Sequence, residues 1–390
     1  MTKKSDAPAI RFKGFSDAWE QRKLGDIASD MVAGGDIDKD LILAEGQYPV
    51  IANALTGDGI VGYYDKEYRV NAPAVTVTGR GDVGHAKARL VNFTPVVRLL
   101  SVKSEHDVFF LENAINTLKI VIESTGVPQL TVPQLAKYEV AFPRQLDEEE
   151  HIGAFFKQLD HLITLHQRKF EKLTNVKKSM LEKMFPQNGS SYPEIRFKGF
   201  TDPWEQRKLG DVADVVGGGT PSTGNQSYWD GDIDWYAPAE IADQIYANSS
   251  QKKITGLGYE NSSAKMLPPG TVLFTSRAGI GKTAILTRKG CTNQGFQSIV
   301  PHRGELDSYF IFSRTEELKR YGELVGAGST FVEVSGKQMA VMELMMPPTM
   351  REQQTIGGFF QQLDHLITLH QRELEKLQNI KKSMLEKMFV

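Results

Sequence analysis

One segment of the sequence has the residue order of a nucleotide-binding loop. Gly279, Gly281, Lys282 and Thr283 stand where a P-loop places glycines around phosphate and a lysine near the terminal phosphate groups. That motif also requires a glycine five positions before Gly281, where this chain has Ser276. We therefore predict no ATP site and interpret the segment as a turn whose polar residues could contact DNA.

The motifs of enzymes that modify or cut DNA are not found. A methyltransferase acting on an exocyclic amine needs an Asn or Asp before a Pro-Pro-aromatic turn, and residues 268–270 and 347–349 lack that side chain. The sequence contains no convincing paired-carboxylate and lysine cluster, no His-x-x-x-His helix and no G-x-S-x-G turn. We predict that the chain has no catalytic residue, no metal site and no cofactor of its own.

The chain does carry side chains of the types that read base edges. Arginine donates to guanine, Asn and Gln bind adenine, and carboxylates accept from the cytosine amine. The residues that we predict to contact DNA are Tyr63, Arg80, His85, Lys87 and Arg89 in the first half, and Thr220, Ser222, Ser276, Arg277, Lys282, Thr283, Asn293 and Gln294 in the second. Asn53 and Tyr64 are comparable in type, and each residue alone also fits an ordinary surface or turn position.

The charge distribution agrees with DNA contact in two segments. The formal net charge is -2, although Lys and Arg supply much of the affinity of DNA-binding proteins. Residues 252–303 contain eight Lys or Arg and a single acid, Glu260, whereas residues 66–103 contain seven against Glu67 and Asp82. Either segment alone is typical of a solvated face, but two at matching places favour a shared binding role.

Length and composition are those of an ordinary cytoplasmic protein with more than one domain. A chain of 390 residues exceeds what one hydrophobic core usually supports. The N-terminus lacks the apolar stretch of a secretory signal, and no run is long and apolar enough for a membrane span. The only cysteine, Cys291, cannot form an internal disulfide, and we interpret it as core packing.

The chain contains a long internal repeat. Residues 10–26 and 195–211 agree at 15 of 17 positions, LDHLITLHQR occurs at 159–168 and 363–372, and KKSMLEKMF occurs at 177–185 and 381–389. The intervening 116 residues (27–142) and 135 residues (212–346) show no running identity. Near-identical ends around divergent middles indicate a shared structural role for the ends and a separate role for each middle.

A weak correspondence survives between the middles. The segment 78–84, TGRGDVG, aligns with 275–281, TSRAGIG, and both follow a strand-like apolar run. The two middles are therefore predicted to share a fold but not a surface.

Two long helices are predicted from the apolar spacing. Positions 152, 159, 166, 173 and 180 form a heptad series that ends before Pro186, and 356 to 384 repeat it. The simplest burial of two such stripes packs one helix against the other. His166 and His370 stand on this seam, and we favour a buried polar contact that fixes register over a metal site.

With these features the chain closely resembles the specificity (S) subunit of type I restriction-modification systems. The most specific elements are WEQRKLGD at 19–26 and 204–211, GGTPS at 218–222, and the two helices. The first middle departs from the pattern, since it has Gly34-Gly35-Asp36 in place of the GGTPS loop.

The resemblance implies an α+β protein with two tandem α/β target recognition domains, separated by two long helices that pack as an antiparallel coiled coil. Its expected parts are recognition domain 1 (1–146), a central helix (147–186), a linker (187–194), recognition domain 2 (195–350) and a C-terminal helix (351–390). Each domain would read one half of a split, asymmetric site in double-stranded DNA, and the helices would set the spacer. The implied partners are two modification subunits, which bind S-adenosylmethionine, and two restriction subunits driven by ATP and Mg.

Two other functions fit parts of the sequence. A coiled-coil scaffold that assembles partners without DNA would need only the helices. A self-contained nuclease or methyltransferase would need the catalytic motifs that are missing.

Overall fold

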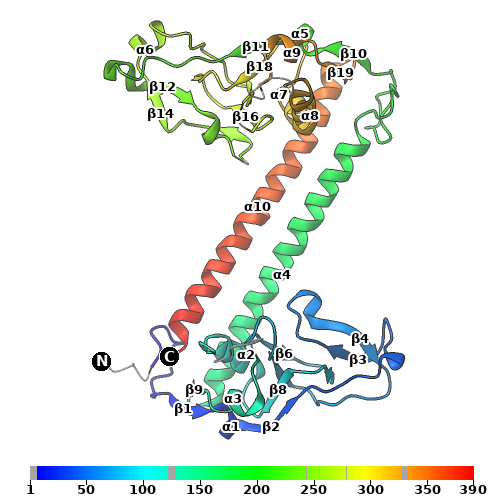
Figure 1. Cartoon of the computed structure of the whole chain (residues 1–390), viewed down its shortest axis with the longest axis vertical. Helices are drawn as coiled ribbons and strands as arrows, with labels where there is room; N and C mark the ends of the chain where they lie inside the picture. Colours follow the sequence, from blue (N-terminus) through cyan, green and yellow to red (C-terminus); the bar gives the residue numbers. More distant parts are fainter. Residues whose placement is uncertain (1–6, 122–128, 243, 278, 327–332) are drawn as a thin grey trace. The chain divides into compact units, whose positions relative to one another are not determined.

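The computed structural model describes residues 7–121, 129–242, 244–277, 279–326 and 333–390 (Figure 1). The chain divides into two compact units that do not follow its linear order. The first unit comprises residues up to Arg168 together with His370–Val390, and the second comprises Lys169–Leu369. Each unit therefore contains one divergent middle, the adjoining part of one long helix and a part of the other helix.

The described residues of the first unit form a two-stranded sheet, β1 (Glu20–Lys23) with β9 (Glu139–Phe142), and two larger sheets. The larger sheet has the order β2-β8-β5-β6, with all neighbours antiparallel, and its strands are Ala28–Ala33, Leu99–Ser104, Ala74–Thr78 and Ala86–Arg89. The smaller sheet has the order β4-β3-β7, with β3 and β7 parallel, and its strands are Ile60–Tyr64, Tyr48–Ile51 and Thr94–Pro95. Strand β5 is buried along its whole length, which agrees with its apolar and β-branched sequence AVTVT.

The second unit repeats this topology. Its larger sheet has the order β11-β18-β15-β16-β13, at Ala213–Gly217, Gln297–Pro301, Val272–Phe274, Thr283–Leu286 and Tyr246–Ala247. Its smaller sheet has the order β14-β12-β17, with β12 and β17 parallel, at Lys252–Ile254, Trp229–Tyr236 and Gly290–Thr292. The prediction that the two middles share a fold is confirmed, and β13 is an addition in the second unit.

Short helices and a pair of antiparallel strands from the two ends of each middle recur in the same order in both units. In the first unit these elements are β1 (Glu20–Lys23), α1 (Leu24–Ile27), α2 (Val108–Asn116), α3 (Val132–Leu135) and β9 (Glu139–Phe142). Their counterparts in the second unit are β10 (Glu205–Lys208), α5 (Leu209–Val212), α7 (Ser308–Ser313), α9 (Gly336–Ala340) and β19 (Glu343–Met346). The second unit also has α6 (Gly256–Glu260) and α8 (Thr315–Gly326).

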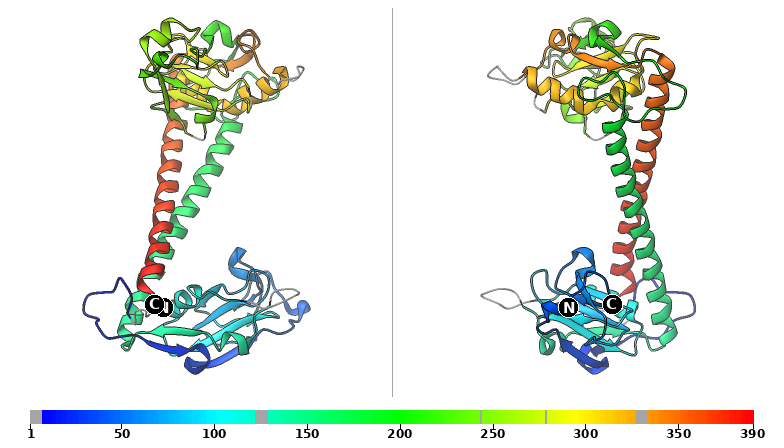
Figure 2. Two further views of the ribbon diagram at one scale, coloured as in Figure 1. Left: turned by 60° about the vertical axis from the view of Figure 1, so that its left-hand side comes forward. Right: turned by 90° about the vertical axis from the view of Figure 1, so that its right-hand side faces the viewer.

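The long helices are α4 (Leu146–Lys183) and α10 (Met350–Met388). Within the first unit Lys381 Nζ lies 2.6 Å from Asp160 Oδ1, and within the second Lys177 Nζ lies 2.5 Å from Asp364 Oδ1. In the first unit Asp160 contacts Lys381 and His166 contacts His370, so residue numbers rise along α4 as they fall along α10, and the helices pack antiparallel there (Figure 2). None of the helices in the described residues is both long and apolar enough to cross a membrane.

The histidine pair predicted on the seam is present. The Nδ1 atoms of His166 and His370 lie 3.2 Å apart, and both residues are half-buried. A polar contact at one level of an apolar seam penalises any shift of one helix along the other, because a shift would bury the ring nitrogens without partners.

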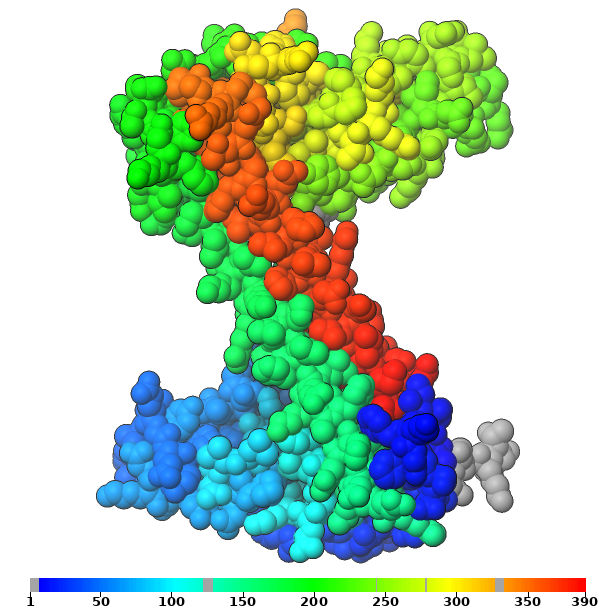
Figure 3. All heavy atoms as spheres, turned by 180° about the vertical axis from the view of Figure 1, so that it is seen from behind, coloured from blue at the N-terminus to red at the C-terminus, as the bar shows by residue number. Residues whose placement is uncertain are grey.

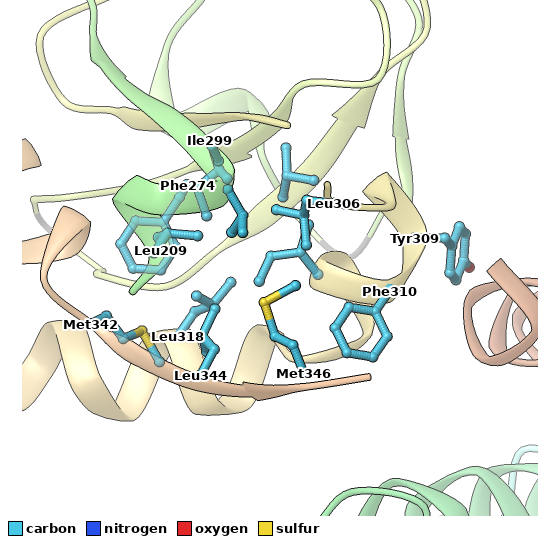
Figure 4. Close-up of a cluster of buried hydrophobic side chains, with 14 of the residues drawn as sticks. Leu209, Phe274, Ile299, Leu306, Tyr309, Phe310, Leu318, Met342, Leu344 and Met346 are labelled. Atoms are coloured by element: carbon cyan, nitrogen blue, oxygen red, sulfur yellow. The ribbon is translucent and has the colours of Figure 1, made fainter. Parts of the chain in front are cut away.

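The C-terminal end of one long helix packs into the core of each compact unit: that of α10 in the first unit and that of α4 in the second. In the second unit Phe185 packs within 6.0 Å, centroid to centroid, of Trp204, Phe310 and Phe360. Phe310 belongs to the cluster in Figure 4, where side chains from the sheet, α7, α8 and β19 meet. In the first unit Met388 and Phe389, near the end of the given sequence, enter the equivalent core of Trp19, Phe110 and Phe156.

The repeated IRFKGF block holds the ends of the long helices. Arg11 forms a two-pronged ion pair with Glu148, at 2.6 and 2.7 Å, and Glu148 is 1% exposed. The backbone N–H of Ile10 donates to the carbonyl of Lys387, and in Figure 3 the N-terminal segment lies against the C-terminal end of α10. In the second unit Arg196–Glu352 and Ile195–Lys183 make the same contacts. The repeated blocks are therefore nearly identical because each makes the same contacts with the long helices.

Candidate nucleic-acid interface

The turn between β5 and β6 carries two of the predicted DNA contacts, Arg80 and His85. The backbone N–H of Thr78 donates to the carbonyl of His85, and the Thr78 hydroxyl donates to the carbonyl of Asp82. The same hydroxyl oxygen accepts from the N–H of His85 at 3.0 Å. Gly84 has a φ of +94°, which favours glycine at this point of the turn. A threonine side chain thus fixes the turn from within.

The turn between β15 and β16 in the second unit has the same hydrogen bonds. The Thr275 N–H donates to Lys282, its hydroxyl donates to Gly279, and it accepts from the N–H of Lys282 at 3.0 Å. The correspondence predicted between 78–84 and 275–281 is confirmed by the hydrogen bonds that Thr78 and Thr275 share, and Ala278 lies outside the described residues. Because strand β16 follows Lys282, this segment lacks the loop-to-helix form of a P-loop.

The equivalent turns share one arginine but differ in the charged residues around it. Arg80 and Arg277 occupy the same place and are both exposed, and Arg277 pairs with Glu333 at 2.7 Å. His85 and Lys282 also correspond, and His85 lies 3.1 Å from Asp82. The backbone frame is therefore shared, whereas the side-chain chemistry differs between the units.

The remaining first-unit candidates lie on strands. Lys87, on β6, is 49% exposed, and its ammonium group forms an ion pair with Asp58. Arg89, further along β6, is half-buried and donates to the Thr76 hydroxyl at 3.0 Å; burial lowers the pKa of its guanidinium. Tyr63 lies apart on β4 of the smaller sheet and is half-buried.

Two comparable residues serve the fold instead. The Asn53 side chain accepts from the N–H of Gly79 at 2.8 Å and donates to the carbonyl of Val97 at 3.0 Å, so it anchors the start of the turn. Tyr64 is buried and donates to the carbonyl of Asp38.

In the second unit the structure brings several candidates together. The Thr220 hydroxyl donates to Gln294 Oε1 at 2.5 Å, and the N–H of Gly295 donates to Asn293 Oδ1 at 2.8 Å. The N–H of Ser276 donates to the carbonyl of Gly295, which joins the loop after β17 to the turn after β15. Hydrogen bonds thus connect the 218–222 loop, the 293–297 run and the turn, so the exposed residues of these segments lie in one region of the surface.

Not every candidate reaches that surface. Ser276 is 0% exposed, and Thr283 is 6% exposed with its hydroxyl 2.7 Å from that of Thr315. Ser222 is exposed, and its carbonyl accepts from the indole of Trp229. Exposed side chains that remain for contact in this unit are those of Ser222, Arg277, Lys282 and Gln294.

The loop glycines are required by the packing of the chain on itself. A Cβ on Gly218 would lie 2.0 Å from the carbonyl oxygen of Asn293, and one on Gly219 would lie 2.3 Å from Ser263 Oγ. In the first unit a Cβ on Gly34 would lie 2.1 Å from the carbonyl oxygen of Val96, just after β7, the counterpart of β17. The two loops therefore correspond in structure, although GGTPS occurs only in the second.

Sequence reasoning missed Asp58. It lies in a turn between β3 and β4, 29 residues before Lys87, and is 59% exposed. The hydrogen bond from Lys87 holds the pKa of its carboxyl below the ordinary value, with smaller contributions from nearby positive charges. The only signal in the sequence was a Gly-Asp-Gly turn, which is common in proteins of every kind.

The described residues include no group of three or more His, Cys, Asp or Glu that could hold a metal ion. Cys291 is buried, and burial raises the pKa of its thiol to about 11, so it is not poised as a nucleophile.

The fold and these turns define a tandem α+β domain protein with a long helix after each domain. The model of the type I restriction modification DNA specificity domain matches residues 16–175 and 201–379, and the chain belongs to this family.

Proteins with similar sequences are named as specificity subunits of type I restriction enzymes. The MjaIX specificity subunit of a type I restriction enzyme from Methanocaldococcus jannaschii is 34% identical over 190 residues, or 48% of this chain and 44% of that protein. The putative MjaX specificity subunit of the same organism is 24% identical over 258 residues, or 65% of this chain and 58% of that protein. The matches thus span about half the length of these relatives.

The fold also resembles a solved structure. The type I restriction-modification S subunit from M. genitalium has a TM-score of 0.69 and 14% identity, with 98% of this chain and 99% of that chain covered. At this level of identity the likeness concerns the fold.

Proposed function

We propose that this chain is the DNA sequence-specificity subunit of a type I restriction-modification complex. Each divergent middle reads one half of a split, asymmetric site, and the helices α4 and α10 set the length of the unread spacer. The observation that carries the proposal is one backbone frame, the turn at Thr78 and at Thr275, that presents different side chains in the two units.

Each turn and its neighbouring loop expose side chains that can hydrogen-bond to base edges. Arg80 and Arg277 can donate to guanine in the major groove, and Gln294 can bind adenine. Lys282 can neutralise a phosphate, which makes binding sensitive to salt. Ser276 and Thr283 are buried and support the turn, so we assign the contacts to their exposed neighbours.

The partners follow from the same proposal. The relatives are named as specificity subunits of restriction enzymes, so modification and restriction subunits, two of each, would supply catalysis, S-adenosylmethionine, ATP and Mg. The chain itself would be non-catalytic, and α4 and α10 would bind the modification subunits.

The decisive experiment exchanges residues 27–142 for the middle of another such subunit and maps the methylated bases in host DNA. Only one half of the methylated sequence should change. A change in both halves, or in neither, would contradict the modular assignment. The reciprocal exchange of residues 212–346 is the matched control and should alter only the other half.

The scaffold and enzyme alternatives predict different results. A coiled-coil scaffold would show no salt-dependent DNA retention on filters in the presence of its partner subunits. A self-contained nuclease or methyltransferase would be active as the purified chain.

A further inference from the structure

Asp58 is placed in an unusual way for an ordinary surface acid. It belongs to the tight turn η2 (Thr56–Gly59), and its φ of +58° lies in the left-handed region that non-glycine residues seldom adopt. The preceding residue, Gly57, has a φ of +57°. Two successive left-handed residues hold the carboxylate at the tip of the turn, where it meets the ammonium group of Lys87 from β6.

The surroundings of this carboxylate are positive. The charges of Arg89, on β6, and Arg168, on α4, both act on Asp58 in addition to the Lys87 ion pair. A lone carboxylate would be repelled by DNA phosphates, but three nearby cations offset that repulsion. The group is thus both ionised and able to approach a polyanion.

From this geometry we propose that Asp58 and Lys87 together read one C·G base pair; the inference rests on the proposed function. In the major groove cytosine presents an amine donor next to the O6 acceptor of guanine. Asp58 would accept from the cytosine amine, and Lys87 would donate to guanine O6 or N7. An adjacent acceptor and donor on the protein match the adjacent donor and acceptor on this base pair.

The second unit is built differently at this place. Residue Ala284 occupies the position of Lys87 and is 0% exposed, so the reading pair is a property of the first unit alone. This agrees with readers that share a frame and diverge in specificity.

The test uses the complex assembled with its modification subunits. The variants are Asp58→Asn and Lys87→Met, and the matched control is Glu20→Gln. That glutamate also forms an exposed ion pair in the first unit, with Arg144, and is 56% exposed. Methylated sequences are mapped, and filter binding compares duplexes in which single C·G pairs are replaced by T·A.

Both variants should lose the preference for C·G at the same position, in the half-site assigned to residues 27–142. The discrimination at that position should fall about ten-fold, as for one lost base contact. The other half of the site and the Glu20→Gln complex should be unchanged, and equal thermal melting should show that the variants are folded.

Three results would overturn the inference. These are unchanged discrimination in both variants, loss at a position in the other half, and a uniform loss over all sequences, which would indicate a phosphate contact. If the wild-type complex methylates no split sequence, the proposed function itself fails, and this inference fails with it.

Discussion

At the scale of single residues, the two equivalent arginines offer a matched pair of tests. Arg80 and Arg277 occupy the same place in the same turn, each in its own unit. We expect Arg80→Ala and Arg277→Ala each to cost about 1–3 kcal/mol of binding and to relax one base position. Binding to duplexes altered in one half-site measures this, with each variant serving as the control for the other. A loss in the same half for both would contradict the assignment.

Glu112, on α2, gives a pH prediction. Burial and the nearby charge of Asp160 raise the pKa of its carboxyl from 4.5 to about 7. The folded chain then holds this proton more tightly than the unfolded chain, so stability falls as pH rises from about 4.5 to about 7 and stays lower above. Glu112→Gln should therefore raise the free energy of unfolding by about 3 kcal/mol near pH 8 and by less than about 1 kcal/mol near pH 5. Urea unfolding at both pH values tests this, and equal effects at both would refute it.

At the scale of elements, the ends of the long helices complete the cores. Phe389 packs within 6.3 Å, centroid to centroid, of Trp19, Phe110 and Phe156. Because Phe389 is half-buried, Phe389→Ala should cost about 2 kcal/mol, and it should loosen residues 27–142 even though it lies at the other end of the sequence. Hydrogen exchange measures the affected segment. Phe185→Ala is the counterpart and should loosen residues 212–346, by about 3 kcal/mol; a reversed pattern would contradict the observed packing.

The repeated IRFKGF block makes a second element-scale prediction. Glu148 is almost completely buried beside Arg11, so Arg11→Met leaves an unpaired charge and should cost about 3 kcal/mol. Arg11→Met with Glu148→Met should recover much of this loss, since no buried charge remains. Thermal unfolding of the two single variants and the double variant provides the comparison. Additive losses would mean that the ion pair does not hold the block to α4.

At the scale of the whole molecule, the lengths of α4 and α10 are the parameter that matters for a spacer. Four residues inserted after Leu165 and four after Leu369 should lengthen both helices by about 6 Å and the unread DNA spacer by about two base pairs. Methylation mapping detects the change. An insertion in α4 alone is the control, because it misaligns the Asp160–Lys381 and Lys177–Asp364 pairs and should reduce assembly. A spacer that stays the same after the double insertion would disprove the ruler.

Local patterns were sufficient for some of these features. The heptad series predicted two long helices and the contact of His166 with His370, because helical periodicity is a local property of the sequence. The alignment of Thr78 with Thr275 predicted equivalent turns, because a threonine that bonds within its own turn needs no distant partner. Burial of Ser276 and Thr283 was not predictable, since it depends on neighbours such as Thr315 that pack from other elements.

The sequence by itself determined that this chain is a duplicated protein with shared ends, two seam-forming helices and two divergent middles, because repeats and periodicity are visible without a fold. The tertiary structure alone decided that residues 370–390 complete the first unit and that Phe185 completes the second. The apolar stripes of α4 and α10 are nearly identical, so they do not show which core each helix end enters. The antiparallel packing of the two helices decides it. Only the tertiary structure shows that Asp58 contacts Lys87, because the folding of the sheets brings together residues that no local pattern connects.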